Sequence, residues 1–233
     1  MLLSGGLDST TVLAAAATKR RVFALSFRYG QRHAAELGCA ARQATRLGAV
    51  AHETVDLGHL GRLLVGASAL IEGSALAVPK LGDASDGIPP TYVPARNALF
   101  LAYALAWAEA IDAVDIWIGT NALDYSGYPD CRPEFITAFA QMAALATRRG
   151  VEGRPIAIAA PLSELRKHEI ITLGHSLGVD YADTISCYDP AGTDPDVRAC
   201  GACDSCRLRR EGFTLAALAD PTRYASSTQA KRP

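Results

Sequence analysis

The 233-residue chain lacks the excess of basic residues that proteins binding DNA or RNA usually carry. Its 23 lysine and arginine residues are balanced by 24 acidic residues, which gives a formal net charge of −1. Dense basic clusters occur only at residues 19–21 and 207–210. Because nucleic-acid binding usually depends on a basic domain or stripe, we expect no nucleic-acid partner.

A long apolar run is also missing. The most apolar of the long uncharged stretches, residues 97–108 (NALFLAYALAWA), is shorter than the roughly 18–20 residues that a bilayer-spanning helix requires. We interpret it as a buried helix. Met1 is followed almost directly by a glycine motif, without the basic and apolar segments of a signal peptide. We therefore expect a cytoplasmic, reducing location with no membrane partner, in which the six cysteines do not form disulfides.

The remaining composition is that of a globular protein. Hydrophobic residues make up 49% and charged residues 20% of the chain, which has no internal repeat and no low-complexity block. Short β-branched or aromatic runs alternate with longer alanine-rich segments, which predicts parallel strands joined by crossover helices and hence an α/β fold. The predicted strands are residues 1–3, 22–27, 49–56, 115–119 and 156–159. The predicted helices are residues 8–18, 34–47, 97–111, 133–149 and 167–177.

Two segments carry little periodic pattern. Residues 73–94 are rich in glycine, proline, serine and aspartate, and a stretch of this length is expected to serve as a lid or a binding loop. Residues 221–233 (PTRYASSTQAKRP) are expected to form a disordered tail. The rest is expected to divide into an α/β domain over residues 1–180 and a small lobe over residues 181–220.

The sequence LLSGGLDSTT, residues 2–11, places a glycine pair, hydroxyls and one carboxylate between a predicted strand and a predicted helix. Such a turn brings free backbone N–H groups to the positive end of a helix dipole, which attracts phosphate. The P-loop pattern GxxxxGK followed by Ser or Thr is absent, and with it the lysine at the β/γ boundary of a nucleotide. A nucleophile is therefore expected to attack the bound nucleotide at a position other than the γ-phosphorus. A plain turn that is N-capped by Ser4 or Asp8 is the alternative for a glycine pair alone.

The full hexapeptide SGGLDS, residues 4–9, resembles the SGGxDS signature of the N-type ATP pyrophosphatases. The resemblance implies a Rossmann-like fold of the adenine nucleotide alpha hydrolase kind, in which residues 1–180 bind ATP. It implies that the loop grips the β- and γ-phosphates as a leaving pyrophosphate while a substrate oxygen attacks the α-phosphorus. Asp8 would hold the Mg²⁺ that neutralises the leaving charge. The implied phosphate-binding residues are Ser4, Gly5, Gly6, Leu7, Asp8, Ser9 and Thr10.

Four of the six cysteines, Cys187, Cys200, Cys203 and Cys206, form the pattern C-x12-C-G-A-C-D-S-C. Four thiolates can close a tetrahedral shell around Zn²⁺. An iron–sulfur cluster is one alternative, since C-x2-C-x2-C also suits one, and a buried cysteine set or a disulfide is another. We favour a structural zinc that clamps a helical C-terminal lobe onto the core, because the closed shell leaves no open position.

Five interior segments together resemble the 7-cyano-7-deazaguanine synthase family, and the resemblance spans residues 2–212. The segments are LSFRYGQRHAAE (25–36), YVPARN (92–97), NALDYSGYPDCRPEF (121–135), PLSELRKHEI (161–170) and the segment TISCY to CRLR (184–209). The resemblance implies a carbon–nitrogen ligase of queuosine biosynthesis. Such an enzyme uses ATP and ammonia to convert 7-carboxy-7-deazaguanine into a nitrile. It also leads us to expect a homodimer.

The implied substrate is a guanine-like base that bears a carboxylate. A guanine edge offers two N–H donors, and the carboxylate of Asp130 can accept both. Tyr125 and Tyr128 can stack on the flat ring or merely pack. Arg96 and Arg132 are candidates for a bidentate grip on the carboxylate or on phosphate. The full set of candidate substrate-binding residues is Arg96, Asp124, Tyr125, Tyr128, Asp130 and Arg132.

Three residues are predicted to take part in catalysis: Asp8, Arg96 and Lys167. Lys167 follows the PLSELR segment, where the resemblance implies contact with phosphate, and a solvated helix start is the alternative. Cys131 has no adjacent base in the sequence, so we interpret it as a wall of the pocket, and Cys39 as a core residue. No catalytic role is assigned to Gln31, His33 and Glu36, which are expected to brace the loop after the second strand.

The implied reaction removes two oxygens from a carboxylate in two rounds. ATP adenylates the carboxylate and ammonia displaces AMP, then a second ATP adenylates the amide oxygen and elimination gives the nitrile. Catalysis would depend on positioning and charge stabilisation rather than on a protein nucleophile. The chain has no room for a glutaminase domain, so free ammonia is the expected nitrogen source. A tRNA-modifying pyrophosphate-loop ATPase and a non-catalytic nucleotide-binding relative in a larger assembly are the alternative functions.

Overall fold

Two pairs of parallel strands form the centre of the computed structural model. The residues that the structure describes are 1–32, 34–80, 87–121 and 127–225. β1 (Phe23–Arg28) pairs with β2 (Ala51–Asp56), and β3 (Asp115–Trp117) pairs with β4 (Ala157–Ala159). Both pairings are parallel, and in the first one Phe23 lies opposite Ala51. These four strands lie within two residues of the predicted ones.

Residues 1–3 join the two strand pairs. The Leu2 N–H donates to the Trp117 carbonyl at 2.9 Å, and the Leu3 N–H donates to the Leu25 carbonyl at 2.9 Å. Leu2 and Leu25 also form a parallel bridge. The predicted first strand is thus reduced to a single bridge, but it occupies the middle of a parallel arrangement whose order is β2, β1, residues 1–3, β3 and β4.

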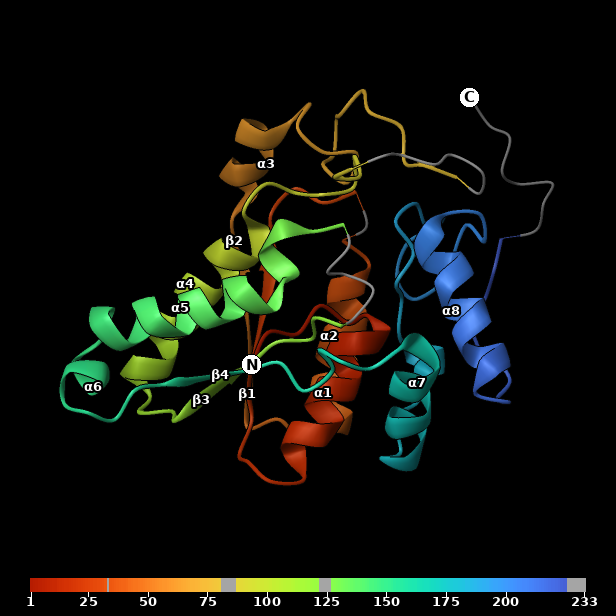
Figure 1. Cartoon of the computed structure of the whole chain (residues 1–233). Helices are drawn as coiled ribbons and strands as arrows, with labels where there is room; N and C mark the ends of the chain where they lie inside the picture. Colours follow the sequence, from red (N-terminus) through yellow and green to blue (C-terminus); the bar gives the residue numbers. More distant parts are fainter. Residues whose placement is uncertain (33, 81–86, 122–126, 226–233) are drawn as a thin grey trace.

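Helices cover both faces of these strands, which confirms the α/β prediction. Figure 1 shows α4 and α5 on one side of the strands, α1 and α2 on the other, and α7 and α8 beyond α1. The helices are α1 (Leu7–Ala17), α2 (Glu36–Arg46), α3 (Gly58–Leu64), α4 (Arg96–Ala110), α5 (Pro133–Ala146), α6 (Arg148–Val151), α7 (Lys167–Ser176) and α8 (Asp204–Leu215). Two 3-10 turns, η2 (Pro129–Cys131) and η3 (Tyr181–Asp183), complete the set. Across the described ranges, no helix has both the length and the apolarity needed to cross a bilayer.

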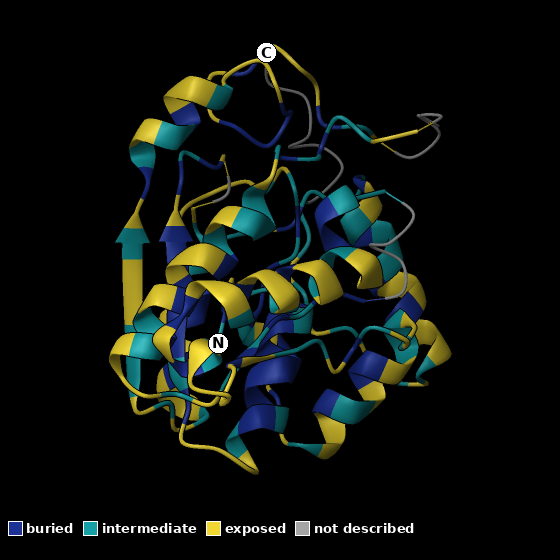
Figure 2. Cartoon of the chain, turned by 60° about the vertical axis from the view of Figure 1, so that its left-hand side comes forward, coloured by how far each residue is buried: buried dark blue, intermediate teal, exposed yellow. Residues whose placement is uncertain are grey.

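The strand β1 is buried on both faces, as a central parallel strand must be. Leu25 and Phe27 belong to the core on the side of α4 and α5, whereas Ala24 belongs to the core on the side of α1 and α2. Neighbouring residues of a strand point to opposite faces, which produces this division. β2 lies at the edge and is half-buried or exposed along its length (Figure 2).

The helix predicted over residues 133–149 is wrong, because the chain forms two helices there. Thr147 separates α5 from α6. Its hydroxyl donates to the Ala143 carbonyl at 2.8 Å and accepts the Gly150 N–H at 3.1 Å, so it ends one helix and caps the next. The helices α1, α2, α4 and α7 begin and end within two residues of their predicted bounds, whereas α3 and α8 were not predicted.

The chain beyond residue 220 differs from the predicted tail. Ala199 and Tyr224 form a parallel bridge, and the Tyr224 hydroxyl donates to Asp220 at 2.6 Å. The Arg210 guanidinium lies 4.1 Å from the centre of the Tyr224 ring, a favourable cation–π contact. Residues 221–225 therefore lie against the small lobe, and the remainder of the predicted tail lies outside the described residues.

Candidate functional site

The SGGLDS segment forms the turn between residues 1–3 and α1, as the sequence predicts. Gly5 has a φ of +84°, and a Cβ at this position would lie 2.1 Å from the Glu36 carbonyl oxygen, so no other residue fits. The hydroxyls of Ser4 and Ser9 lie 3.0 Å apart, and Ser9 also accepts the Ser4 N–H at 3.2 Å. Ser4 Oγ in turn accepts the Gly6 N–H. These bonds fix the shape of the turn without a ligand.

A cavity of about 230 Å³ opens in front of this turn. It lies at the carboxyl ends of the parallel strands, where α/β proteins bind nucleotides. The turn and the segment after β3 contribute Ser4, Gly6, Leu7, Asp8, Ser9, Gly119 and Thr120 to the wall. A second set of lining residues, which we call the inner group, consists of Tyr29, Glu36, Arg96, Phe100 and Tyr128. The glycine turn and the inner group thus share one cavity.

Asp8 and Lys167, which the sequence places 159 residues apart, meet beside the turn. The Lys167 ammonium lies 2.8 Å from each carboxylate oxygen of Asp8, and both side chains are largely shielded from solvent. Asn121 donates to the same carboxylate at 3.3 Å. Since Asp8 is the second residue of α1 and Lys167 the first of α7, the packing of these two helices sets the pair.

The inner group combines aromatic rings with a guanidinium. Arg96 Nη1 donates to the Tyr29 hydroxyl at 3.1 Å, and the ring centroids of Tyr29 and Phe100 lie 5.4 Å apart. The Tyr128 hydroxyl lies 3.4 Å from that of Tyr188. Arg96 is the first residue of α4, where Ala95 before it takes the left-handed conformation. Arg96 and Tyr128 therefore lie in the cavity wall, where the sequence predicts substrate contacts.

Glu36 brings a carboxylate into the same wall. It is the first residue of α2, directly after the segment that follows β1. Burial raises the pKa of Glu36 to about 8, although the charge of Arg96 and a hydrogen bond from Gln31 act in the opposite direction. An acidic group with a perturbed pKa inside a cavity is typical of a functional site. The expectation that Glu36 only braces the loop after the second strand therefore omits its place in the cavity wall.

Two of the predicted substrate residues do not line the cavity. Asp130 is buried, and its carboxylate accepts the Asn97 N–H at 2.8 Å, so it caps the start of α4 instead of facing a ligand. Arg132 is exposed at the start of α5, and its Nε donates to the Pro129 carbonyl. The structure therefore places neither side chain in the cavity wall. Asp124 and Tyr125, with His33, lie outside the described residues.

The motif itself is only partly exposed to the cavity. Thr10 is fully buried within α1 and is not part of the wall, and its hydroxyl has no hydrogen-bond partner among the described residues. Gly5 is also absent from the wall, because it packs against the start of α2. Thr120 lines the cavity with a hydroxyl that has no partner among the described residues. No sequence signal distinguishes Thr120 from other residues that follow a strand.

The wall is completed from the other end of the chain by Ile185, Ser186, Tyr188 and Ser205. Ser186 Oγ accepts the Leu7 N–H at 3.2 Å, and the Ile185 N–H donates to the Gly5 carbonyl at 3.2 Å. Ser205, on the first turn of α8, donates its hydroxyl proton to the Ser186 carbonyl. The small lobe thus rests directly on the glycine turn. The sequence showed these residues only as neighbours of the cysteine motif.

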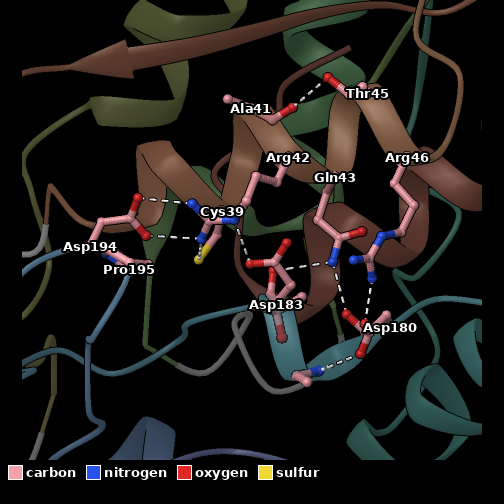
Figure 3. Close-up of polar contacts among 12 residues, drawn as sticks. Cys39, Ala41, Arg42, Gln43, Thr45, Arg46, Asp180, Asp183, Asp194 and Pro195 are labelled. Atoms are coloured by element: carbon pink, nitrogen blue, oxygen red, sulfur yellow. Dashed lines mark hydrogen bonds and ion pairs between the residues drawn. The ribbon is translucent and has the colours of Figure 1, made fainter.

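A polar network from α2 holds the segment that carries Ser186 (Figure 3). Gln43 is fully buried, and its amide nitrogen donates to the carbonyls of Asp180 and Asp183 at 2.8 and 3.1 Å. Arg42 donates to the carboxylate of Asp183 at 2.8 Å and grips both carboxylate oxygens of Asp194 at 2.8 and 2.9 Å. Such bidentate pairs fix orientation as well as distance. One helix therefore touches the glycine turn and also anchors the small lobe.

The four clustered cysteines converge as their spacing predicts. All four sulfurs lie within 4.8 Å of one another, and the Cys187 and Cys203 sulfurs are 4.0 Å apart. A tetrahedral zinc with bonds of about 2.3 Å would place its sulfurs about 3.8 Å apart, so the arrangement fits a metal shell. The Cys187 sulfur accepts the N–H groups of Asp189 and Cys200. These donors stabilise thiolate charge, so the cluster can bind a metal ion.

Comparison with known proteins identifies the family of this chain. The family model described as queuosine biosynthesis protein QueC matches residues 1–217. A 7-cyano-7-deazaguanine synthase of Thiobacillus denitrificans is 61% identical over 226 residues, which cover 97% of each chain. A protein of the same name from Pseudomonas syringae pv. syringae is 57% identical, over 96% of this chain and 94% of the relative. The solved NMN synthetase of Francisella tularensis superposes with a TM-score of 0.47 at 17% identity, over 97% of this chain and 77% of that one. The chain belongs to the queuosine biosynthesis protein QueC family.

Proposed function

We propose that this protein is a 7-cyano-7-deazaguanine synthase, which converts 7-carboxy-7-deazaguanine, ATP and ammonia into the nitrile, AMP and pyrophosphate. The observation that carries the proposal is the shared cavity, in which the glycine turn and the inner group line one space. Reaction between a nucleotide and a flat, charged base requires both to lie in such a space. The name carried by the relatives at 57–61% identity supports the same activity.

In the proposed first round, a carboxylate oxygen of the substrate attacks the α-phosphorus of ATP and pyrophosphate leaves. The backbone and the hydroxyls of Ser4 and Ser9 would bind the β- and γ-phosphates at the start of α1. The Lys167 ammonium would stay in contact with the pyrophosphate as it leaves, and Arg96 would bind the carboxylate of the substrate. These groups stabilise the negative charge that develops during adenylation.

Ammonia then displaces AMP to give the amide. In the second round the amide oxygen attacks a second ATP, and loss of AMP together with the amide protons leaves the nitrile. Both rounds activate the same carbon, so one cavity serves both. Tyr29 is buried and accepts a hydrogen bond from Arg96, and this pair would keep the ring of the substrate base in place between the two rounds. We propose free ammonia as the nitrogen source.

The residues present fit a magnesium ion at the phosphate end. Asp8 supplies a carboxylate at the mouth of the turn, and hard cations such as Mg²⁺ prefer oxygen ligands shared with substrate phosphates. Lys167 holds this carboxylate in the ligand-free cavity. When bound, the ion would neutralise charge on the pyrophosphate.

We also propose zinc as the metal of the four-cysteine cluster and a structural role for it. Among the described residues the group of possible ligands consists of four cysteines, which matches structural zinc sites. The lobe would span residues 181–220, against an ATP-binding domain over residues 1–180. A homodimer in the cytoplasm is the form in which we expect the enzyme to work.

The decisive experiment incubates the purified protein with 7-carboxy-7-deazaguanine, Mg-ATP and ammonium, and follows the products by mass spectrometry. We expect the amide to appear first and the nitrile second, with two AMP and two pyrophosphate formed for each nitrile. Formation of ADP would contradict attack at the α-phosphorus. Turnover of ATP without conversion of any deazapurine would favour another function of the fold.

A further inference from the structure

A guanine-like ring needs an acceptor for the two adjacent N–H donors on its edge, and the structure removes the obvious candidate. Asp130 is not part of the cavity wall, and its carboxylate is engaged by the backbone at the start of α4. Pairing between two parallel donors and a carboxylate is the geometry that distinguishes a guanine-like edge from other purine edges. Another carboxylate of the cavity wall must therefore be sought.

Two carboxylates lie in the wall within the described residues, Asp8 and Glu36. Asp8 belongs to the phosphate end, where Lys167 contacts both of its oxygens. A base bound there would displace the phosphates that the turn is built to hold. Glu36, in contrast, lines the wall together with the rings of the inner group.

The position of Glu36 is fixed by the backbone around it. Its carbonyl oxygen packs against Gly5 of the turn, where even one additional carbon atom would clash. Glu36 is the first residue of α2. The contacts of Gln43 and Arg42 anchor later turns of the same helix. Gln31 also forms a hydrogen bond with the Glu36 side chain, and a residue whose backbone is fixed in this way can select a ligand by geometry.

We propose that Glu36 reads the edge of the substrate base, with its two carboxylate oxygens accepting the ring N–H and the exocyclic amine of a 2-amino-pyrimidinone ring. This inference rests on the proposed function and names the specificity residue of the same cavity. The Tyr29 and Phe100 rings, which line the same wall, supply apolar surface for the flat ring. Arg96 would then meet the carboxylate at the reacting end of the substrate.

The charge balance of the inner group agrees with this assignment. Burial keeps the pKa of Glu36 near 8 in the ligand-free cavity, so the side chain is largely protonated at neutral pH. Two N–H donors from a ligand favour the ionised form, as does the neighbouring guanidinium of Arg96. A base without such donors would not stabilise the ionised form of Glu36, and the site would reject it.

The test compares 7-carboxy-7-deazaguanine with an analogue that lacks the exocyclic amine, using wild-type protein and the isosteric variant Glu36→Gln. For the wild type we expect kcat/KM to favour the natural base by about 10- to 100-fold, the usual discrimination of a bidentate pair. In Glu36→Gln the preference should fall to near unity. The KM for the natural base should rise by a similar factor, while the KM for ATP changes less than twofold.

Glu53→Gln serves as the matched control, because Glu53 is exposed on the edge strand β2, and it should keep the wild-type preference. Wild-type protein that accepts both bases equally would overturn the inference even if Glu36→Gln failed to fold. A Glu36→Gln variant with undiminished preference would overturn it too. Absence of any turnover by the wild type would instead overturn the proposed function and, with it, the assignment of Glu36.

Discussion

At the scale of single residues, the pairing of Asp8 with Lys167 is the feature most directly linked to chemistry. A carboxylate and an ammonium 2.8 Å apart neutralise each other. Arrival of a polyphosphate with its magnesium would offer each of them a new partner of opposite charge. The pair is therefore expected to separate upon ATP binding.

We predict that Asp8→Asn will lower the rate of adenylation by about 10²- to 10³-fold, because a group that stabilises developing charge is lost while its shape is retained. Pyrophosphate release at saturating ATP over a range of Mg²⁺ concentrations measures the effect. Asp196→Asn is the control, since the Asp196 side chain is 89% exposed, and it should behave as wild type. Wild-type rates for Asp8→Asn at every magnesium concentration would rule out the assigned role.

Residue chemistry was predictable from the sequence where a motif specified it. SGGLDS and the cysteine spacing located the turn and the cysteine cluster, because both motifs are short-range patterns. The sequence did not show that Asp130 accepts the Asn97 N–H, because the two residues are 33 positions apart. Glu36 was not predicted as a site residue, since a glutamate at a helix start is also what an ordinary helix prefers.

At the scale of elements, α2 is the helix that connects the parts of the site. One of its ends touches the glycine turn, and its buried face contributes Gln43, whose amide nitrogen donates to two carbonyls of the segment 180–183. Helix periodicity predicted α2 well, but a buried glutamine within that apolar stripe could not be interpreted without its partners. The sequence pattern likewise did not predict that Thr147 separates α5 from α6, because this separation depends on the hydrogen bonds of one hydroxyl.

We predict that Gln43→Leu will destabilise the fold by about 1–3 kcal/mol, because the hydrogen bonds that its buried amide donates to the Asp180 and Asp183 carbonyls are lost. Chemical denaturation gives this free energy. The variant should also raise the KM for ATP, since the segment it releases carries Ser186, which accepts the Leu7 N–H. Gln141→Leu, at an exposed position of α5, is the matched control and should leave both quantities near their wild-type values. Equal stability of the two variants would contradict the anchoring role.

At the scale of the whole molecule, the small lobe is part of the site and not an appendage. Ser186 and Ser205 flank the cysteine cluster in the sequence and also line the cavity. The sequence predicted the family and the convergence of the four cysteines, but not that residues beside these cysteines form a wall of the cavity. Contacts between segments some 180 residues apart leave no local pattern from which they could be read.

We predict that metal analysis of anaerobically purified protein will find about one zinc per chain, and that Cys206→Ser will lower both the zinc content and the melting temperature. Because the lobe supports the wall, ATP affinity should fall at least several-fold in the same variant. Cys39→Ala, which removes a buried thiol outside the cluster, should keep its zinc. Zinc-free wild-type protein with full ATP affinity would contradict the structural role.

The cavity wall includes residues 2–4 and 6–9 as well as Ile185, Ser186, Tyr188 and Ser205. A ribosome must therefore synthesise most of the polypeptide before these two parts of the wall can meet. A nascent chain that ends before residue 185 lacks the second part.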